Sequence, residues 1–68
     1  MMVSLTVNGK PVELAQETPL PEFLAARGID AKHIAVARNG EVVVRGTYDG
    51  VLLCAGDVVE IVRMIGGG

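Results

Sequence analysis

The sequence predicts an α+β domain in which one short helix packs on one face of a mixed five-strand sheet. Three observations predict it. Two Asn-Gly pairs each join two apolar segments, one stretch with helical spacing lies between these pairs, and an apolar segment runs into the C-terminal glycines. The chain has 68 residues, half of them hydrophobic, which suits one small domain with a single core.

The N-terminal hairpin is predicted by alternation of apolar and polar residues. Val3–Val7 alternates without a break, so a half-buried strand is expected there. Asn8-Gly9 follows, a pair that favours a tight type I′ turn because both turn positions need a positive φ. Val12 and Leu14 alternate with a polar residue on the returning strand, and Pro11 is expected near the start of that strand or on a sheet edge.

The helix is predicted between a threonine and a glycine. Thr18 is expected to cap its N-terminus, with Pro19 at the first helical position. Gly28 is expected to end the helix in the left-handed conformation, with Ile29 packing back on the last turn in a Schellman motif. The apolar stripe that packs on the sheet has the spacing i, i+3, i+4 and consists of Leu20, Phe23 and Leu24.

The second half of the chain is predicted to hold three strands. The first covers 34–37, and the turn Asn39-Gly40 joins it to a second strand at 41–44. Residues 46–56 are expected to be irregular because they contain three glycines, and the last strand covers 57–63. The order strand, strand, helix, strand, strand, strand is that of the β-grasp, or ubiquitin-like, fold. A βαββαβ fold is the competitor, but it needs a second helix, which these glycines disfavour.

The last strand is expected to present a docking surface on the face opposite the helix. Val59 and Ile61 are expected to face the helix. The residues expected to face outward, beside Ala35 and Ala37, are Val58, Glu60 and Val62. An apolar patch on an uncovered sheet face is typical of a docking surface, although β-branched residues also simply suit strands. In the loop before this strand, Tyr48 and Leu53 are expected to anchor the chain to the core.

The terminal residues Ile65-Gly66-Gly67-Gly68 are interpreted as a flexible functional tail following a domain at 1–64. Glycine has no Cβ, so the tail can enter a narrow channel, and four extended residues reach about 13–14 Å. The carboxylate of Gly68 is ionised near neutral pH and is a poor electrophile. Another enzyme must activate it, and that enzyme must supply the Mg²⁺ that offsets the charge of ATP.

Composition excludes several other classes of function. The net charge of −2 and the pI of about 5.1 disfavour a nucleic-acid partner. Neither a membrane span nor a signal peptide is expected, and no Cys/His cluster points to a metal. With one cysteine, no internal disulfide is expected, which indicates a cytoplasmic protein. Cys54 itself is interpreted as a small buried hydrophobe, with a sulfur acceptor as the alternative.

Three segments carry a resemblance: Val36-Ala37-Arg38-Asn39-Gly40-Glu41-Val42-Val43, Leu53-x-x-Gly56-Asp57-x-Val59-Glu60-Ile61-Val62, and Gly67-Gly68. In combination they resemble the ThiS family, the small sulfur carriers of bacterial thiamine synthesis, over essentially the whole chain. The chain departs from the family pattern at Val44 and Tyr48, where many relatives have proline and tryptophan.

The resemblance implies a protein cosubstrate rather than an enzyme. An E1-like adenylating enzyme would activate the last glycine with ATP and Mg²⁺ that it binds itself, so this chain would hold no cofactor or metal. Sulfur from a cysteine desulfurase system would then give a C-terminal thiocarboxylate, from which thiazole synthase would take sulfur for the thiazole ring. The free carrier is expected to be a monomer. By position, Gly68 bears the sulfur, and the residues expected to contact partners are Gly67, Gly66, Ile65, Met64, Val58, Glu60 and Val62.

Two alternatives remain open on the sequence. The first keeps the chemistry but serves molybdopterin synthesis or the thiolation of tRNA or an amino acid, and the molybdopterin carriers are usually somewhat longer. The second is a β-grasp interaction module with an inert tail, which the acidic pI and the lack of basic or aromatic stripes disfavour.

Overall fold

The computed structural model describes residues 2–64; Met1 and residues 65–68 lie outside the described part. Its first elements are strands β1 (Val3–Val7), β2 (Lys10–Leu14) and β3 (Thr18–Pro19), then helix α1 (Leu20–Ala26). The second half contains the short 3₁₀ helix η1 (Ala31–His33), strands β4 (Ile34–Arg38) and β5 (Glu41–Val42), the 3₁₀ helix η2 (Arg45–Gly50), and strands β6 (Leu52–Leu53) and β7 (Val58–Arg63).

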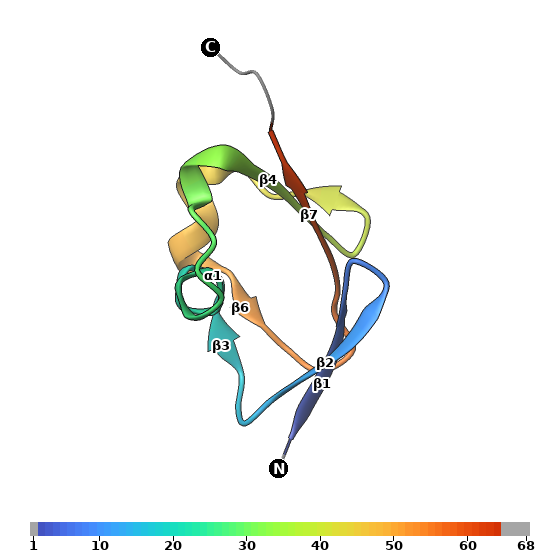
Figure 1. Ribbon diagram of the computed structural model, residues 1–68. Helices are drawn as coiled ribbons and strands as arrows, with labels where there is room; N and C mark the ends of the chain where they lie inside the picture. The colour runs from blue at the N-terminus through green and yellow to red at the C-terminus, as the bar shows by residue number, and fades with distance from the viewer. Residues whose placement is uncertain (1, 65–68) are drawn as a thin grey trace.

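Five strands form one mixed sheet in the order β2-β1-β7-β4-β5. The neighbours β1 and β7 are parallel, whereas the other neighbouring pairs of this sheet are antiparallel. Helix α1 packs on one face of the sheet (Figure 1). The predicted β-grasp architecture is therefore confirmed, and the last strand lies in the middle of the sheet.

Both Asn-Gly pairs form the expected turns. Asn8 and Gly9 have φ values of 51° and 79°, and Asn39 and Gly40 have 53° and 84°. Positive φ at both central positions is the mark of the tight hairpin turn, and its twist matches that of the flanking strands. The first turn sets the register in which Val3 pairs with Leu14, so alternate residues of β1 reach the core together.

The predicted start of the helix is wrong by one residue, and Thr18 does not cap it. Pro19 occupies the N-cap position, where no side-chain hydrogen bond is made, and the hydroxyl of Thr18 donates to the carbonyl of Gln16 at 2.9 Å. The first helical N–H, that of Leu20, donates instead to the carbonyl of Val51 at 2.8 Å. A distant carbonyl thus satisfies the first donor of the helix, and the second helical residue, Pro21, has no N–H that a capping side chain could accept.

The predicted end of the helix is confirmed. Gly28 has a φ of 69°, and its N–H donates to the carbonyl of Ala25 at 3.0 Å. The N–H of Ile29 donates to the carbonyl of Leu24 at 2.9 Å, which completes the Schellman pattern. Ile29 packs against the core, so this ending fixes the direction in which the chain leaves the helix.

The segment predicted to be irregular contains two short regular elements. Arg45–Gly50 forms η2, and Leu52–Leu53 forms β6, which pairs antiparallel with β3 in a second, two-stranded sheet. The strand predicted at 41–44 is correspondingly shorter, because β5 ends at Val42. The expected anchors are confirmed: Leu53 is fully buried and Tyr48 is 6% exposed.

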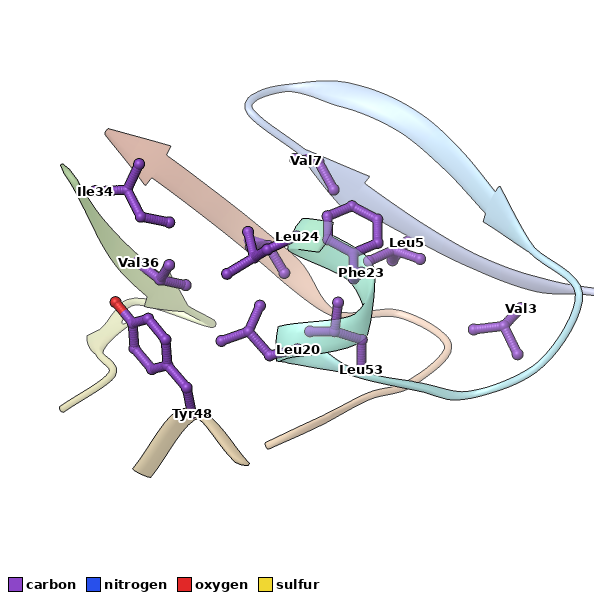
Figure 2. Close-up of a cluster of buried hydrophobic side chains, with 11 residues drawn as sticks. Val3, Leu5, Val7, Leu20, Phe23, Leu24, Ile34, Val36, Tyr48 and Leu53 are labelled. Atoms are coloured by element: carbon purple, nitrogen blue, oxygen red, sulfur yellow. The ribbon is translucent and has the colours of Figure 1, made fainter. Parts of the chain in front are cut away.

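One hydrophobic core holds the two layers together (Figure 2). Helix α1 contributes Leu20, Phe23 and Leu24, and the sheet contributes alternate residues of β1, β4 and β7. Tyr48 from η2 and Leu53 from β6 close one side of this cluster. Val59, at the centre of the sheet, is fully buried, so the core fixes β7 through one of its two faces.

Candidate functional site

The outward face of β7 is exposed, as predicted. Val58 is 49% exposed and Val62 is 60% exposed, with Glu60 exposed between them, whereas Val59 is fully buried and Ile61 packs against the core. Residues that pair directly across an antiparallel sheet share a face. Ala35 pairs with Val62 and Ala37 with Glu60, so the predicted neighbours lie beside the outward residues.

The register adds one residue to this surface that the sequence analysis did not include. Ala37 also pairs with Val42 of β5, so Val42 lies on the same face, and it is 79% exposed. We define the outer patch as Val58, Val62, Val42, Ala35 and Ala37. Within residues 2–64 no helix covers this face of the sheet. The contribution of Val42 depends on the pairing of β4 with β5, which alternation within one strand does not reveal.

The two turn asparagines hold β7 from both sides. The side chain of Asn8 accepts from the N–H of Ile61 at 2.8 Å and donates to the carbonyl of Ile61 at 3.3 Å. The side chain of Asn39 accepts from the N–H of Val58 at 2.9 Å, and the backbone N–H of Asn39 donates to the carbonyl of Val58 at 2.7 Å. Each asparagine thus forms hydrogen bonds with the backbone of β7 like those of a neighbouring strand. The turns that close the hairpins therefore also fix the position of β7.

Asp57 anchors the start of β7, which the sequence analysis did not anticipate. Its carboxylate accepts from Nε of Arg38 at 3.0 Å, from Nδ2 of Asn39 at 3.1 Å and from the N–H of Cys54 at 2.8 Å. Arg38 Nη2 lies 2.9 Å from the same carboxylate. Burial by itself raises the pKa of Asp57, but these hydrogen bonds and the charge of Arg38 outweigh it, so the pKa lies below its ordinary value.

Cys54 is half-buried, and its thiol donates to the carbonyl of Leu52 at 3.3 Å. Burial raises the pKa of this thiol, and the neighbouring carboxylate of Glu17 raises it further. A thiol with a raised pKa holds less of the reactive thiolate at neutral pH. The raised pKa of this thiol disfavours the sulfur-acceptor alternative, while the side chain is half-buried and not buried as predicted.

The sheet pairing of the chain continues one residue past β7. The N–H of Met64 donates to the carbonyl of His33 at 2.8 Å, and the side chain of Met64 is 55% exposed. Arg45 Nη2 donates to the carbonyl of Ile34 at 3.0 Å and lies 3.9 Å from the sulfur of Met64. The chain is thus held by the sheet up to its last described residue. The predicted tail residues Ile65, Gly66, Gly67 and Gly68 lie outside the described residues.

Among residues 2–64, no group of three or more His, Cys, Asp and Glu side chains is placed to hold a metal ion. In the same part of the chain, no helix has the length and apolar character needed to cross a membrane.

Within residues 2–64, one α-helix packs on a mixed sheet whose central strand, β7, is the last in the sequence, and this arrangement defines a β-grasp protein of the ubiquitin-like class. Comparison with known proteins narrows this class. The model of the ThiS family matches residues 5–68, and the chain belongs to the ThiS family.

Named relatives agree with this assignment. The chain is 38% identical to the sulfur carrier protein ThiS of Bacillus subtilis over 65 residues, which cover 94% of this chain and 98% of that protein. The crystal structure of the thiamine biosynthesis protein ThiS from Geobacter metallireducens superposes with a TM-score of 0.84 at 38% identity, covering 97% of this chain and all of that one. A thiazole synthase of Magnetococcus marinus is 39% identical over 66 residues, but the chain spans only 20% of that protein's length.

Proposed function

We infer that this protein is a sulfur carrier of thiamine biosynthesis, a protein cosubstrate rather than a catalyst. Membership of the ThiS family and the near full-length likeness to a sulfur carrier carry this conclusion. The structure agrees with it physically, since the core, both Asn-Gly turns and the Asp57 network all fix the strand that precedes the tail. The domain would then be a rigid holder for a C-terminus on which other proteins act.

The chemistry that we propose takes place at Gly68. A carboxylate oxygen of Gly68 attacks the α-phosphate of ATP. This step forms the acyl-adenylate and releases pyrophosphate. A desulfurase forms a persulfide from cysteine, and the terminal sulfur of this persulfide adds to the acyl carbon and displaces AMP. A dithiol reductant then cleaves the resulting acyl disulfide, which gives the thiocarboxylate and the free desulfurase thiol and leaves the reductant as a disulfide. The adenylating enzyme binds ATP and also supplies the Mg²⁺ that offsets the negative charge of ATP. The thiocarboxylate sulfur is a better nucleophile than the oxygen that it replaces.

Thiazole synthase is the proposed acceptor of the sulfur. Two thiazole synthases, from Magnetococcus marinus and Paramagnetospirillum magneticum, match this chain over about a fifth of their length, which supports a carrier that works next to that enzyme. We place the reaction in the cytoplasm because a carrier with a free thiol and a thiocarboxylate suits a reducing compartment. The alternative is that the carrier serves molybdopterin synthesis or tRNA thiolation. The enzyme that accepts the sulfur from the thiocarboxylate distinguishes these pathways.

The direct test is the intact mass of the protein. After incubation with an E1-like adenylating enzyme, ATP, Mg²⁺, cysteine, a desulfurase and a dithiol reductant, we expect a mass gain equal to one oxygen-to-sulfur exchange at the C-terminus. The gain should disappear when thiazole synthase and its other substrates are added. A chain that keeps its mass with an enzyme that loads the Bacillus subtilis relative would contradict the carrier function.

The outer patch is the proposed docking surface, and Val58→Asp tests it. Val58 is about half exposed and packs on no core residue, so the free energy of unfolding should change by no more than about 0.5 kcal/mol. A charge placed in an apolar interface should weaken binding of the adenylating enzyme about tenfold or more, measured as the dissociation constant by calorimetry.

Leu52→Asp is the matched control for that substitution. Leu52 is 42% exposed, similar to Val58, but it belongs to the two-stranded sheet and not to the outer patch. It should leave the dissociation constant within about twofold. Equal weakening by the two substitutions would show that added negative charge, and not the outer patch, controls binding.

A further inference from the structure

An open hollow of about 700 Å³ lies where β7 ends. Its lining comes from three parts of the chain: residues 27–30, which follow α1; His33 and Ile34, where η1 meets β4; and Arg63 and Met64, at the end of β7. Six of the lining residues are Arg27, Ile29, His33, Ile34, Arg63 and Met64. It is distinct from the outer patch, since none of the residues of the outer patch lines it.

The hollow and its immediate neighbours are strongly basic. Arg27 and Arg63 line it, Arg45 donates to the carbonyl of Ile34 in its wall, and Lys32 lies in η1 beside His33. Asp30 is the one carboxylate among the lining residues, and it already accepts from the N–H of Lys32 and lies 3.6 Å from His33. The lining itself carries two cations, Arg27 and Arg63, against this one carboxylate, a formal charge of +1, whereas the whole chain carries −2, so the rest of the chain carries −3.

The charges at the hollow are not neutralised within the domain. Of the arginines, Arg38 forms the ion pair with Asp57, far from the hollow along β7, while the described ion pairs include none for Arg27, Arg45 or Arg63. Arg27 stacks over the ring of Phe23, with 4.8 Å between the guanidinium carbon and the ring centroid, which holds its charge at the rim. A fixed and unneutralised basic rim on an acidic protein attracts an anion.

The position of the hollow decides which anion it meets. Residues 65–68, when extended, reach about 13–14 Å, so an enzyme that acts on Gly68 must lie against the surface around Met64. The nucleotide bound at the terminal carboxylate would then lie about that far from Arg63, beyond the reach of its side chain. The anion nearest to the hollow is therefore a group of the enzyme itself.

We propose that the basic hollow receives an acidic side chain, Asp or Glu, from the enzyme that adenylates the tail. The apolar wall formed by Ile29, Ile34 and Met64 accommodates the aliphatic part of the same segment. The carboxylate forms charge-assisted hydrogen bonds with Arg27 and Arg63, which present planar donor pairs that match a carboxylate. This inference rests on the proposed function, and it adds a second contact that orients the base of the tail.

The test compares two substitutions that change the charge equally. Arg63→Glu at the hollow should raise the dissociation constant for the adenylating enzyme at least about tenfold at low salt. Lys10→Glu, on β2 and opposite Val7, should raise it less than about threefold, because Lys10 does not line the hollow and β1 separates its strand from β7. The increases in the dissociation constant caused by Arg63→Gln and Arg27→Glu should lie between these two values. The melting temperature of each variant shows whether it is folded.

Three outcomes decide the matter. If Arg63→Glu and Lys10→Glu weaken binding of the enzyme equally, the hollow is not a specific contact, and long-range electrostatic attraction alone explains the effect. If Arg63→Glu binds as the wild type does, the hollow makes no contact with the enzyme. Sulfur loading of the wild type, measured by mass in the same samples, separates this inference from the proposed function. If the wild type is loaded and the hollow variants bind the enzyme as tightly as it does, only the proposed role of the hollow is rejected. If the wild type is not loaded, the carrier function itself is rejected.

Discussion

Adding one alanine after Gly68 should abolish formation of the thiocarboxylate. The extra residue moves the reactive carboxylate about 3.5 Å farther from the domain and puts a Cβ where the natural chain has none. A domain held against the enzyme at its outer patch cannot shift by that distance without losing contacts. Because in-line attack on ATP needs the reacting atoms within about 3–3.5 Å, we expect sulfur loading to fall at least about a hundredfold in intact-mass assays.

The matched control adds the same alanine before Met1. Strands β1 and β7 are parallel, and the end of β1 pairs with the start of β7, so the N-terminal end of β1 lies far from the end of β7. This variant should load sulfur at the wild-type rate. If the C-terminally extended protein still gains sulfur, or still supports thiazole formation, then the free carboxylate of Gly68 is not the reacting group.

Asp57→Ala should produce the largest loss of stability among single substitutions of a polar residue. It removes the acceptor for Arg38, Asn39 and the N–H of Cys54 together. Breaking a buried pair leaves its partners unsatisfied, which costs about 3–5 kcal/mol, but the Arg38 side chain is 30% exposed and regains some hydration. We expect a loss of about 2–3 kcal/mol, or roughly 10–20 °C in Tm for a domain of this size.

Asp49→Ala is the control, since Asp49 is an exposed carboxylate in η2. It should change the free energy of unfolding by less than about 0.5 kcal/mol. Urea denaturation followed by circular dichroism measures both variants. If Asp57→Ala and Asp49→Ala unfold at the same urea concentration, then the network around Asp57 does not anchor β7.

The same network predicts how stability depends on pH. The pKa of Asp57 in the folded protein is lowered from the ordinary value of 3.8. Its contribution is therefore fully present above that ordinary value and is lost as the pH falls through the folded-state pKa. The difference in unfolding free energy between wild type and Asp57→Ala should be constant from neutral pH to about pH 5 and should shrink below it. A difference that grows on acidification would contradict the assigned direction of the pKa shift.

Local patterns predicted most of the architecture because they depend on the chain's own neighbours. Alternation in Val3–Val7 and in the last strand identified which side chains face the helix, and the Asn-Gly pairs identified both turns. The error at Thr18 has a different origin. A threonine before a helix suits a cap, but the pairing of Thr18 with Leu53 made it a strand residue instead. The chain 35 residues away thus overrode a local preference.

The site divides along the same line. The outward positions of Val58, Glu60 and Val62 followed from alternation alone, and the family followed from motifs spread along the chain. Val42 joined the outer patch only through its pairing with Ala37. Alternation within a strand defines its two faces, but it does not define which strand lies next to it. The sequence therefore identified the patch on the last strand but not how far the patch extends onto other strands.

By itself, the sequence determined the order of elements, the two hairpin turns, the inward face of the last strand and the terminal glycines, because each depends on backbone preferences and on spacing within a few residues. Only the tertiary structure decided that Asp57 joins Arg38 and Asn39, and that Arg27 and Arg63 line one hollow. These groups lie 18 to 36 residues apart in the sequence, and their meeting depends on strand register and on where the helix ends. Periodicity shows which way a side chain faces, whereas packing alone selects the side chains that it meets.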